Sequence, residues 1–306
     1  MKLPLILALM LFSAKIGINA APALDTAKID SVTGLKGKWN EKEGVYKVSW
    51  PRNDVKVSVD SWTMPAFMGL GTWAAFTGTT EKALMMGDTV LFEDEVNPVM
   101  PAALDNGLSV TALHNHFFFD QPKVYFMHIE GMDKIDNVAG AVRKVYDKIK
   151  EIRAADPKPK ATFGQKPLPG KNSITVGPLN EIFGLTGEVK DGMVKFSLGH
   201  KAKMDGFDIG NDIGVNTWAA FAGTDDDAVV DGDFAVEEDQ LQTALKSLRR
   251  DRINIVAIHT HMTNEEPRIL FFHYWGRGKA KDLARSIEDA LMVAGLLKGV
   301  TTQAQH

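Results

Sequence analysis

The chain has 306 residues, of which 44% are hydrophobic and 24% are charged, a composition typical of a globular protein with one or two domains. The formal net charge of −4, without a long Lys/Arg run, argues against a nucleic-acid partner. The chain contains no cysteine, which excludes disulfides, thiol catalysis and a lipid anchor attached through a cysteine.

The N-terminus has the pattern of a secretory signal peptide. Lys2 precedes the apolar run 3–12, and the small residue Ala20 stands at the expected cleavage position. The run is too short for a permanent membrane span, and no other segment approaches transmembrane length. We therefore expect residues 1–20 to be removed and the protein to be periplasmic or secreted.

The rest of the chain contains an internal repeat. The segment TWAAF occurs at 72–76 and again at 217–221, an offset of 145 that is preserved from there onward. Near Gly34 and its counterpart Gly184 the offset is 150, so the first copy carries small insertions before residue 56. Such self-similarity indicates a gene-internal duplication. The predicted organisation is as follows: signal peptide 1–20, first repeat 24–153, a Pro/Lys-rich linker 154–173, second repeat 174–298 and tail 299–306.

Each copy has the apolar patterns of a mixed fold. In the first copy, short strands are predicted around 45–49, 55–60, 72–77 and 88–92, followed by a helix, two more strands and a closing helix. Each closing helix has an apolar stripe at helical spacing: Ile135, Val138, Val142, Val145, Ile149 and Ile152 in copy one, and Ala280, Leu283, Ile287 and Leu291 in copy two. We predict an α+β fold of two homologous halves, each a mostly antiparallel sheet with two packed helices.

Six of the eight histidines belong to the repeated pattern. It reads His-x-His followed by a third histidine on the next predicted strand: His114, His116 and His128 in copy one, and His259, His261 and His273 in copy two. Strict alternation would place Leu108, Val110, Ala112, His114 and His116 on one face of a strand. Three imidazoles from two adjacent strands would suit zinc, or copper, iron or nickel. The alternative is that these histidines hydrogen-bond the backbone and hold the hairpin together.

A carboxylate could complete such a site. Glu93 and Glu238 are 145 residues apart and follow a predicted strand, so either could ligate a metal, orient a histidine or act as a general base. The competing interpretation is helix N-terminal charge, because both stand where a helical stretch opens.

Other repeated residues have structural interpretations. Trp73, Trp218, Phe76 and Phe221 are predicted to lie in the core. The pairs Gly87-Asp88 and Gly232-Asp233 are predicted to be turns. A Gly-rich phosphate loop and a Gly-x-Ser-x-Gly elbow are both missing from the sequence, so neither a nucleotide cofactor nor serine hydrolase chemistry is expected.

The sequence leaves three functions open. The first is an exported protein that binds a transition metal or small ligand at duplicated His-x-His...His sites. The second is a metal-dependent hydrolase or lyase with Glu93 or Glu238 as base. The third is a structural envelope module with hydrogen-bonded histidines. A bound metal would separate the first two from the third.

A family resemblance covers nearly all of the chain after the signal peptide. The motifs that carry it are Gly87-Asp88, Glu93-Asp94-Glu95-Val96, Thr111-Ala112-Leu113-His114-Asn115-His116, Pro122 and His128-Ile129-Glu130-Gly131. These motifs resemble the LppY/LpqO family, a bacterial domain of unknown function. The resemblance implies an exported bacterial protein with two tandem units. Named actinobacterial members are described as lipoproteins, whereas this chain has no cysteine to lipidate.

Overall fold

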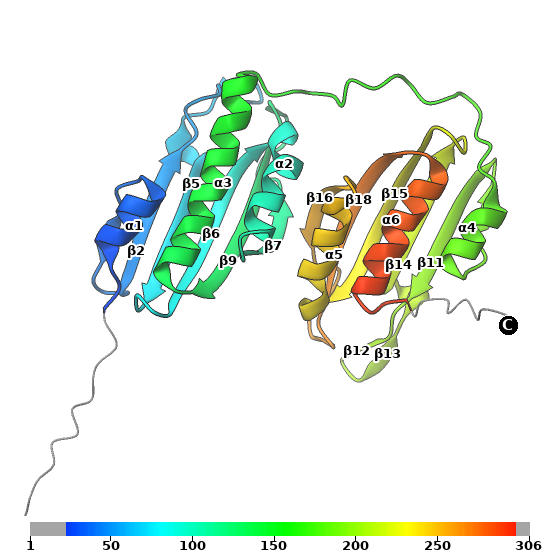
Figure 1. The fold of residues 1–306 in the computed structure, drawn as a ribbon. Coiled ribbons are helices and arrows are strands. Elements are labelled where there is room, and N and C mark those ends of the chain that lie inside the picture. Colours follow the sequence, from blue (N-terminus) through cyan, green and yellow to red (C-terminus); the bar gives the residue numbers. More distant parts are fainter. Residues whose placement is uncertain (1–22, 298–306) are drawn as a thin grey trace, which may run out of the picture.

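The structure is a computed structural model that describes residues 23–297 (Figure 1). The predicted signal peptide, 1–20, and the predicted tail, 299–306, lie outside the described residues. Within residues 23–297, no helix is both long enough and apolar enough to cross a membrane.

The first half contains three α-helices and nine strands. In chain order these are α1 (Thr26–Thr33), β1 (Lys38–Asn40), β2 (Val45–Pro51), β3 (Ser58–Val59), β4 (Trp62–Thr63), β5 (Gly71–Gly78), β6 (Ala83–Phe92), α2 (Glu93–Leu104), β7 (Ser109–His114), β8 (Asp120–Gln121), β9 (Val124–Asp133) and α3 (Ile135–Ala155). A short 3₁₀ helix, η1 (Ala66–Met68), precedes β5.

The second half repeats this order. It contains α4 (Val176–Phe183), β10 (Glu188–Lys190), β11 (Met193–Gly199), β12 (Ala202–Met204), β13 (Phe207–Ile209), η2 (Asn211–Ile213), β14 (Asn216–Gly223), β15 (Ala228–Glu237), α5 (Glu238–Arg250), β16 (Asn254–His259), β17 (Glu265–Glu266), β18 (Ile269–Gly278) and α6 (Ala280–Val293). From β5 onward, each strand of the main sheet starts 145 residues before its counterpart, so the duplication seen in the sequence is a duplication of structure.

Both halves contribute to one twelve-stranded sheet. Its order is β1-β2-β5-β6-β9-β7-β16-β18-β15-β14-β11-β10, and every neighbouring pair is antiparallel. The second half of this order mirrors the first, which places an approximate twofold axis between β7 and β16. The α+β fold of two homologous halves is thus confirmed, with the short helices α1 and α4 added to the two helices expected in each half.

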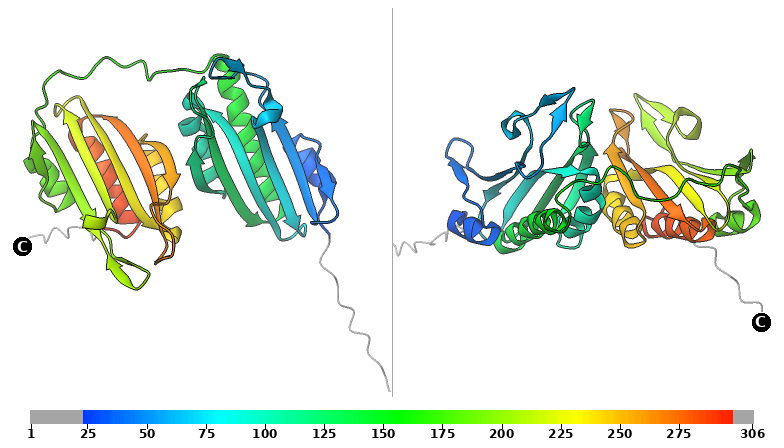
Figure 2. Two further views of the ribbon diagram at one scale, coloured as in Figure 1. Left: turned by 180° about the vertical axis from the view of Figure 1, so that it is seen from behind. Right: turned by 90° about the horizontal axis from the view of Figure 1, so that it is seen from above.

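All the helices cover one face of the sheet (Figure 2). The predicted stripe of α3 is buried at Ile135, Val138 and Ile149, and the stripe of α6 is buried at Leu283 and Ile287. The opposite face, which we call the open face, has two small three-stranded sheets instead, β4-β3-β8 and β13-β12-β17. Each covers a small core of its own, such as the one that contains Phe126.

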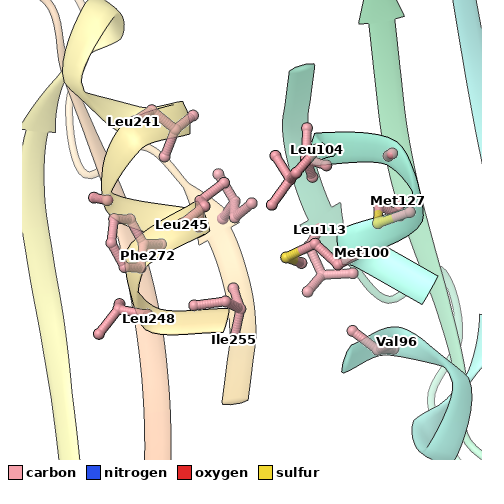
Figure 3. Packing of buried hydrophobic residues seen from close by; sticks show 14 of the residues in the cluster. Val96, Met100, Leu104, Leu113, Met127, Leu241, Leu245, Leu248, Ile255 and Phe272 are labelled. Atoms are coloured by element: carbon pink, nitrogen blue, oxygen red, sulfur yellow. The ribbon is translucent and has the colours of Figure 1, made fainter. Parts of the chain in front are cut away.

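The halves meet at a seam where β7 crosses β16. Leu113 is paired with Ile258 at the crossing. Below it, α2 and α5 bring apolar side chains from both halves into one core, and Figure 3 shows Leu104 and Leu113 on one side facing Leu245 and Ile255 on the other. Burial of this kind is the main favourable term in folding and in association.

Two side-chain amides extend the pairing on each side of the crossing. Asn97 of α2 donates to the carbonyl of Ile255 at 3.1 Å and accepts from its N–H at 2.7 Å. Gln242 of α5 accepts from the N–H of Val110 at 2.8 Å and donates to its carbonyl at 3.0 Å. Asn97 and Gln242 are 145 residues apart, as are Val110 and Ile255. Leu113 and Ile258 are the single residue pair between β7 and β16, so each amide supplies hydrogen bonds to a backbone stretch that has no partner on the other strand of the seam.

The first half also contains a buried ion pair. Both guanidinium NH groups of Arg52 donate to the Glu95 carboxylate at 2.8 Å, and both side chains are fully buried. Arg153 also contacts Glu95, at 2.9 Å, and pairs with Asp94. The position of Glu95 is taken by Gln240 in the second half, so this feature is not duplicated.

Candidate functional site

The histidines lie on the open face. On β9, Met127 and Ile129 belong to the helix-side core, so the alternate residues Phe126 and His128 point the other way. His128 is paired with Asp88 on β6, and in the second half His273 is paired with Asp233 on β15. Each half therefore brings an aspartate and a histidine side by side on this face.

A β-bulge determines which residues of β7 lie on the open face beside His128 and Asp88. The register between β7 and β9 shifts between Val110 and Ala112, and β16 has the same irregularity between Ile255 and Ala257. Val110 and Leu113 consequently lie in the helix-side core, whereas His114 faces the open side. The predicted sharing of one face by Leu108, Val110, Ala112, His114 and His116 is wrong, because the extra residue of a bulge breaks the alternation.

The second-half cluster contains a group of residues that could hold a metal ion. One ligand atom from each of Asp233, His259 and His261 lies within 4.8 Å of the other two. The Nε2 atoms of His259 and His261 are 3.1 Å apart, and Nε2 of His261 is 3.4 Å from a carboxylate oxygen of Asp233. His273 stacks on His259 with ring centroids 4.9 Å apart, and its Nδ1 lies 3.3 Å from the carbonyl oxygen of Gly232.

The first-half cluster has the equivalent residues in a different arrangement. Here the Nε2 atoms of His114 and His128 are 3.1 Å apart. The ring of His116 is 5.1 Å from that of His114 and stacks on Phe126 at 3.4 Å. Phe271 supports His261 in the same way at 3.5 Å. The three histidines predicted for each half are therefore neighbours in both halves, although His116 and His261 follow the ends of β7 and β16.

Burial governs the protonation of these groups. It raises the pKa of Asp233 above its ordinary value, while His273 and His261 act in the opposite direction. Burial likewise raises the pKa of Asp88. Burial also lowers the pKa of His259 to about 4, with smaller contributions from His273 and His261. The imidazole of His259 is thus neutral at pH 7, which is the form that binds a metal.

Asp88 and Asp233 were not among the candidate site residues predicted from the sequence, because each follows a glycine and the pair has the composition of a turn. The prediction of turns at Gly87-Asp88 and Gly232-Asp233 is wrong, since both pairs lie inside long strands. A Cβ at Gly87 would lie 2.8 Å from the carbonyl oxygen of Trp73, and one at Gly232 would lie 2.2 Å from the Tyr274 hydroxyl. Each glycine therefore allows a neighbouring group to approach the strand closely on the helix side of the sheet, and the aspartate that follows it points to the open face. The common offset of 145 was the sequence signal available for them.

The repeated aromatic residues divide between the two faces. Phe76 and Phe221 are buried in the helix-side core, as predicted. Trp73 and Trp218 are only partly buried and are paired with Asp88 and Asp233, respectively, so their assignment to the core is wrong. Lys47 lies 3.9 Å from the ring centroid of Trp73, and Lys195 lies 4.5 Å from that of Trp218.

The structure does not bring Glu93 or Glu238 to the histidines. Glu93 lies five positions after Asp88, which is roughly 16 Å along an extended strand. Glu93 lines a cavity of about 220 Å³ with Asn97 and Tyr125, and none of the six histidines is among its lining residues. Glu238 forms an ion pair with Arg268 at 3.3 Å. Both glutamates start a helix, in agreement with the helix-charge interpretation.

Together these observations define a duplicated α+β domain with a His/Asp cluster on the open face of each copy. The protein family described as "Domain of Unknown Function (DUF1259)" matches the chain twice, over residues 27–148 and 177–293. The chain belongs to this family and carries two tandem copies of its domain. A search of curated proteins finds no significant match.

One solved structure shows a weak likeness. It is the crystal structure of a trimeric bacterial microcompartment shell protein, PduB, which is 10% identical to this chain and is matched over 84% of this chain and 89% of that one. The TM-score is 0.22, which is too low for the likeness to carry any argument about fold or function.

Proposed function

We propose that this protein is an exported metal-binding protein, in which the His/Asp clusters hold transition-metal ions and zinc is the ion that suits them best. The observation that carries the proposal is the convergence of Asp233, His259 and His261 on one small volume. Export, removal of residues 1–20 and an affiliation with LppY/LpqO-like proteins are parts of the same proposal and rest on the sequence.

The spacing of the ligand atoms supports a tetrahedral ion. Two nitrogens that bind one zinc ion at 2.0–2.1 Å in tetrahedral geometry are about 3.3 Å apart. The Nε2 atoms of His259 and His261 are 3.1 Å apart, and those of His114 and His128 are also 3.1 Å apart. Two imidazole nitrogens lie this close either when one donates a hydrogen bond to the other or when both bind the same cation. Copper, iron and nickel accept the same nitrogen ligands, so the ion in the cell also depends on supply.

Buried atoms of the clusters fit a cation. Among residues 23–297, the Oδ1 atoms of Asp88 and Asp233 and Nδ1 of His259 are buried without a hydrogen-bond partner. A buried carboxylate oxygen without a partner is costly, and a metal ion would supply a positive charge beside it. We propose Asp233, His259 and His261 as ligands in the second half, with His273 either as a fourth ligand or as a support for His259.

We propose that the cluster of the second half binds its ion more tightly than the cluster of the first half. The ligand atoms of its aspartate and two histidines already lie within 4.8 Å of one another. In the first half the closest nitrogens belong to His114 and His128, and His116 stacks on Phe126. His116 would have to turn toward Asp88 to complete an equivalent site. A general-base role for Glu93 or Glu238 has no support from their positions.

The test is metal content and affinity of the full chain, purified without a histidine tag. The double variant His259→Ala/His261→Ala should lose the tightest ion, and Asp233→Asn should weaken it at least tenfold, in the range of losses that follow from removing a ligand or its close support. His200 provides a matched control, because it lies in the second half but bonds Thr217 at 3.0 Å. His200→Gln should keep the ion.

The hydrogen-bonding alternative predicts a different result. If the wild type and the variant lacking all six clustered histidines take up the same amount of zinc, the clusters have only a structural role. Equal loss of metal in His200→Gln and in the double variant would also contradict the proposed ligand set.

A further inference from the structure

The two histidine clusters lie against the seam on the same face of the continuous sheet. β7 and β16 are antiparallel, with Leu113 paired with Ile258 at their crossing. Both of these side chains belong to the helix-side core. The residues next to them in sequence therefore face the open side. Among these are His114 and His259.

The register places these two histidines diagonally across the seam. Antiparallel pairing about Leu113 and Ile258 sets His259 opposite Ala112 and His114 opposite Ala257. Diagonal neighbours on one face of an antiparallel pair have backbones about 7–8 Å apart. A small molecule could therefore span the distance between His114 of the first cluster and His259 of the second.

Two alanines occupy the surface between the clusters. Ala112 is paired with His128 on β9, and Ala257 is paired with His273 on β18. On the open face, each alanine is therefore flanked by a histidine of its own half and, across the seam, by a histidine of the other half. A larger side chain at either position would fill the space between the clusters.

The charges of this face change sign when ions are bound. Two divalent ions would bring four positive charges to neutral imidazoles. Besides the histidines, the charged residues that act on the two cluster aspartates, Asp88 and Asp233, are Lys47 and Asp231, respectively. The loaded face is therefore positive. With His273 as a support for His259, two or three protein ligands per ion leave at least one tetrahedral position for an anion.

We infer that the two clusters form one composite centre, which holds two transition-metal ions and a small dianion of the dicarboxylate or phosphate class between them. The inference rests on the proposed function, because the ions supply the charge and the open positions. It adds that the two halves bind one ligand jointly across the approximate twofold axis.

A composite centre makes the two ions repel each other. Two doubly charged ions on the order of 10 Å apart in water would weaken the second binding step roughly tenfold at low ionic strength. The Debye length falls to about 3 Å at 1 M salt, so the difference should almost disappear there. A bridging dianion should also reduce the difference between the two binding affinities, since the dianion interacts favourably with both ions.

Calorimetric titration of zinc into the metal-free full chain tests this inference. At about 10 mM ionic strength we expect two ions per chain, with the second bound roughly tenfold more weakly and the difference reduced by succinate or inorganic phosphate. The variant His259→Ala/His261→Ala should bind one ion, and its affinity for the dianion should fall at least tenfold. Tighter binding of succinate than of phosphate would assign a dicarboxylate, and the reverse would assign a phosphate.

A substitution between the clusters separates bridging from metal binding. Ala112→Leu should keep two ions but weaken the dianion about tenfold. Ala75→Leu is the matched control, because Ala75 lies on β5 away from the seam, and it should bind the dianion as the wild type does.

The outcomes distinguish this inference from the proposed function. Two ions that bind independently at low salt, a single ion per chain, or an Ala112→Leu variant with unchanged dianion binding would each overturn the composite centre while metal binding stands. A chain that binds no ion overturns both.

Discussion

Removal of the Asn97 side chain should weaken the seam measurably. In Asn97→Ala, the N–H and the carbonyl of Ile255 lose their partners, and Ile255 is only 1% exposed. A buried backbone group without a partner costs about 1–3 kcal/mol. Two such groups are affected, so we expect the free energy of unfolding to fall by about 2–6 kcal/mol, the lower figure applying if water enters the seam.

Urea unfolding followed by circular dichroism measures this change. Asn106→Ala is the control, because Asn106 is exposed and makes one bond, to the carbonyl of Ala102 at 2.9 Å. Its cost should stay within about 0.5 kcal/mol. The variant Asn97→Ala/Gln242→Ala should lose less than the sum of the single changes, since the two amides stabilise one interface. If Asn97→Ala costs no more than Asn106→Ala, the amide does not hold the halves together.

Three further predictions concern buried charge. Asp233→Asn should raise the melting temperature of the metal-free protein above about pH 4, because burial raises the native pKa of this carboxyl and makes its ionised form unfavourable; a lower melting temperature at pH 7 would contradict this. The native pKa of His259 is about 4, below an unfolded value near 6.5, so the metal-free chain should lose stability as the pH falls between these values. His259→Gln should flatten that slope in urea midpoints, and an unchanged slope would show that other groups cause it. Glu95→Gln should cost about 3–5 kcal/mol in guanidinium unfolding, because it leaves Arg52 buried without its carboxylate; a cost below about 1 kcal/mol would show that Asp54 suffices as its partner.

The sequence was sufficient to predict the parts of the fold that depend on local pattern. The repeated segments and the apolar stripe of α3 predicted two α+β halves. A helix with one apolar stripe, such as Val138 to Ile149, buries that stripe by packing it against a sheet. The bulges between Val110 and Ala112 and between Ile255 and Ala257 were not predictable, since a bulge depends on pairing with a strand that follows later in the chain.

The grouping of the histidines was predicted from the sequence, whereas the aspartates beside them were not. Spacing alone brought His114, His116 and His128 together, because a short connection joins two adjacent strands. Gly87-Asp88 has the composition of a turn, and only the approach of the Trp73 carbonyl shows why a glycine is needed within β6. Glu93 had the right spacing from its counterpart, yet it starts a helix beyond the end of the strand.

The seam has a consequence for how such a chain can diverge. Asn97 contacts Ile255 and Gln242 contacts Val110, so each half recognises its counterpart with the same surface, as the subunits of a twofold dimer do. A protein with one copy of the domain could build the same sheet from two separate chains. Fusion of the two copies in one chain makes the effective concentration of one half for the other independent of expression level. It also allows the two copies to accumulate different substitutions. In this chain the copies differ in that Arg52 and Glu95 form a buried pair in the first half, whereas the aspartate and histidines are better gathered in the second.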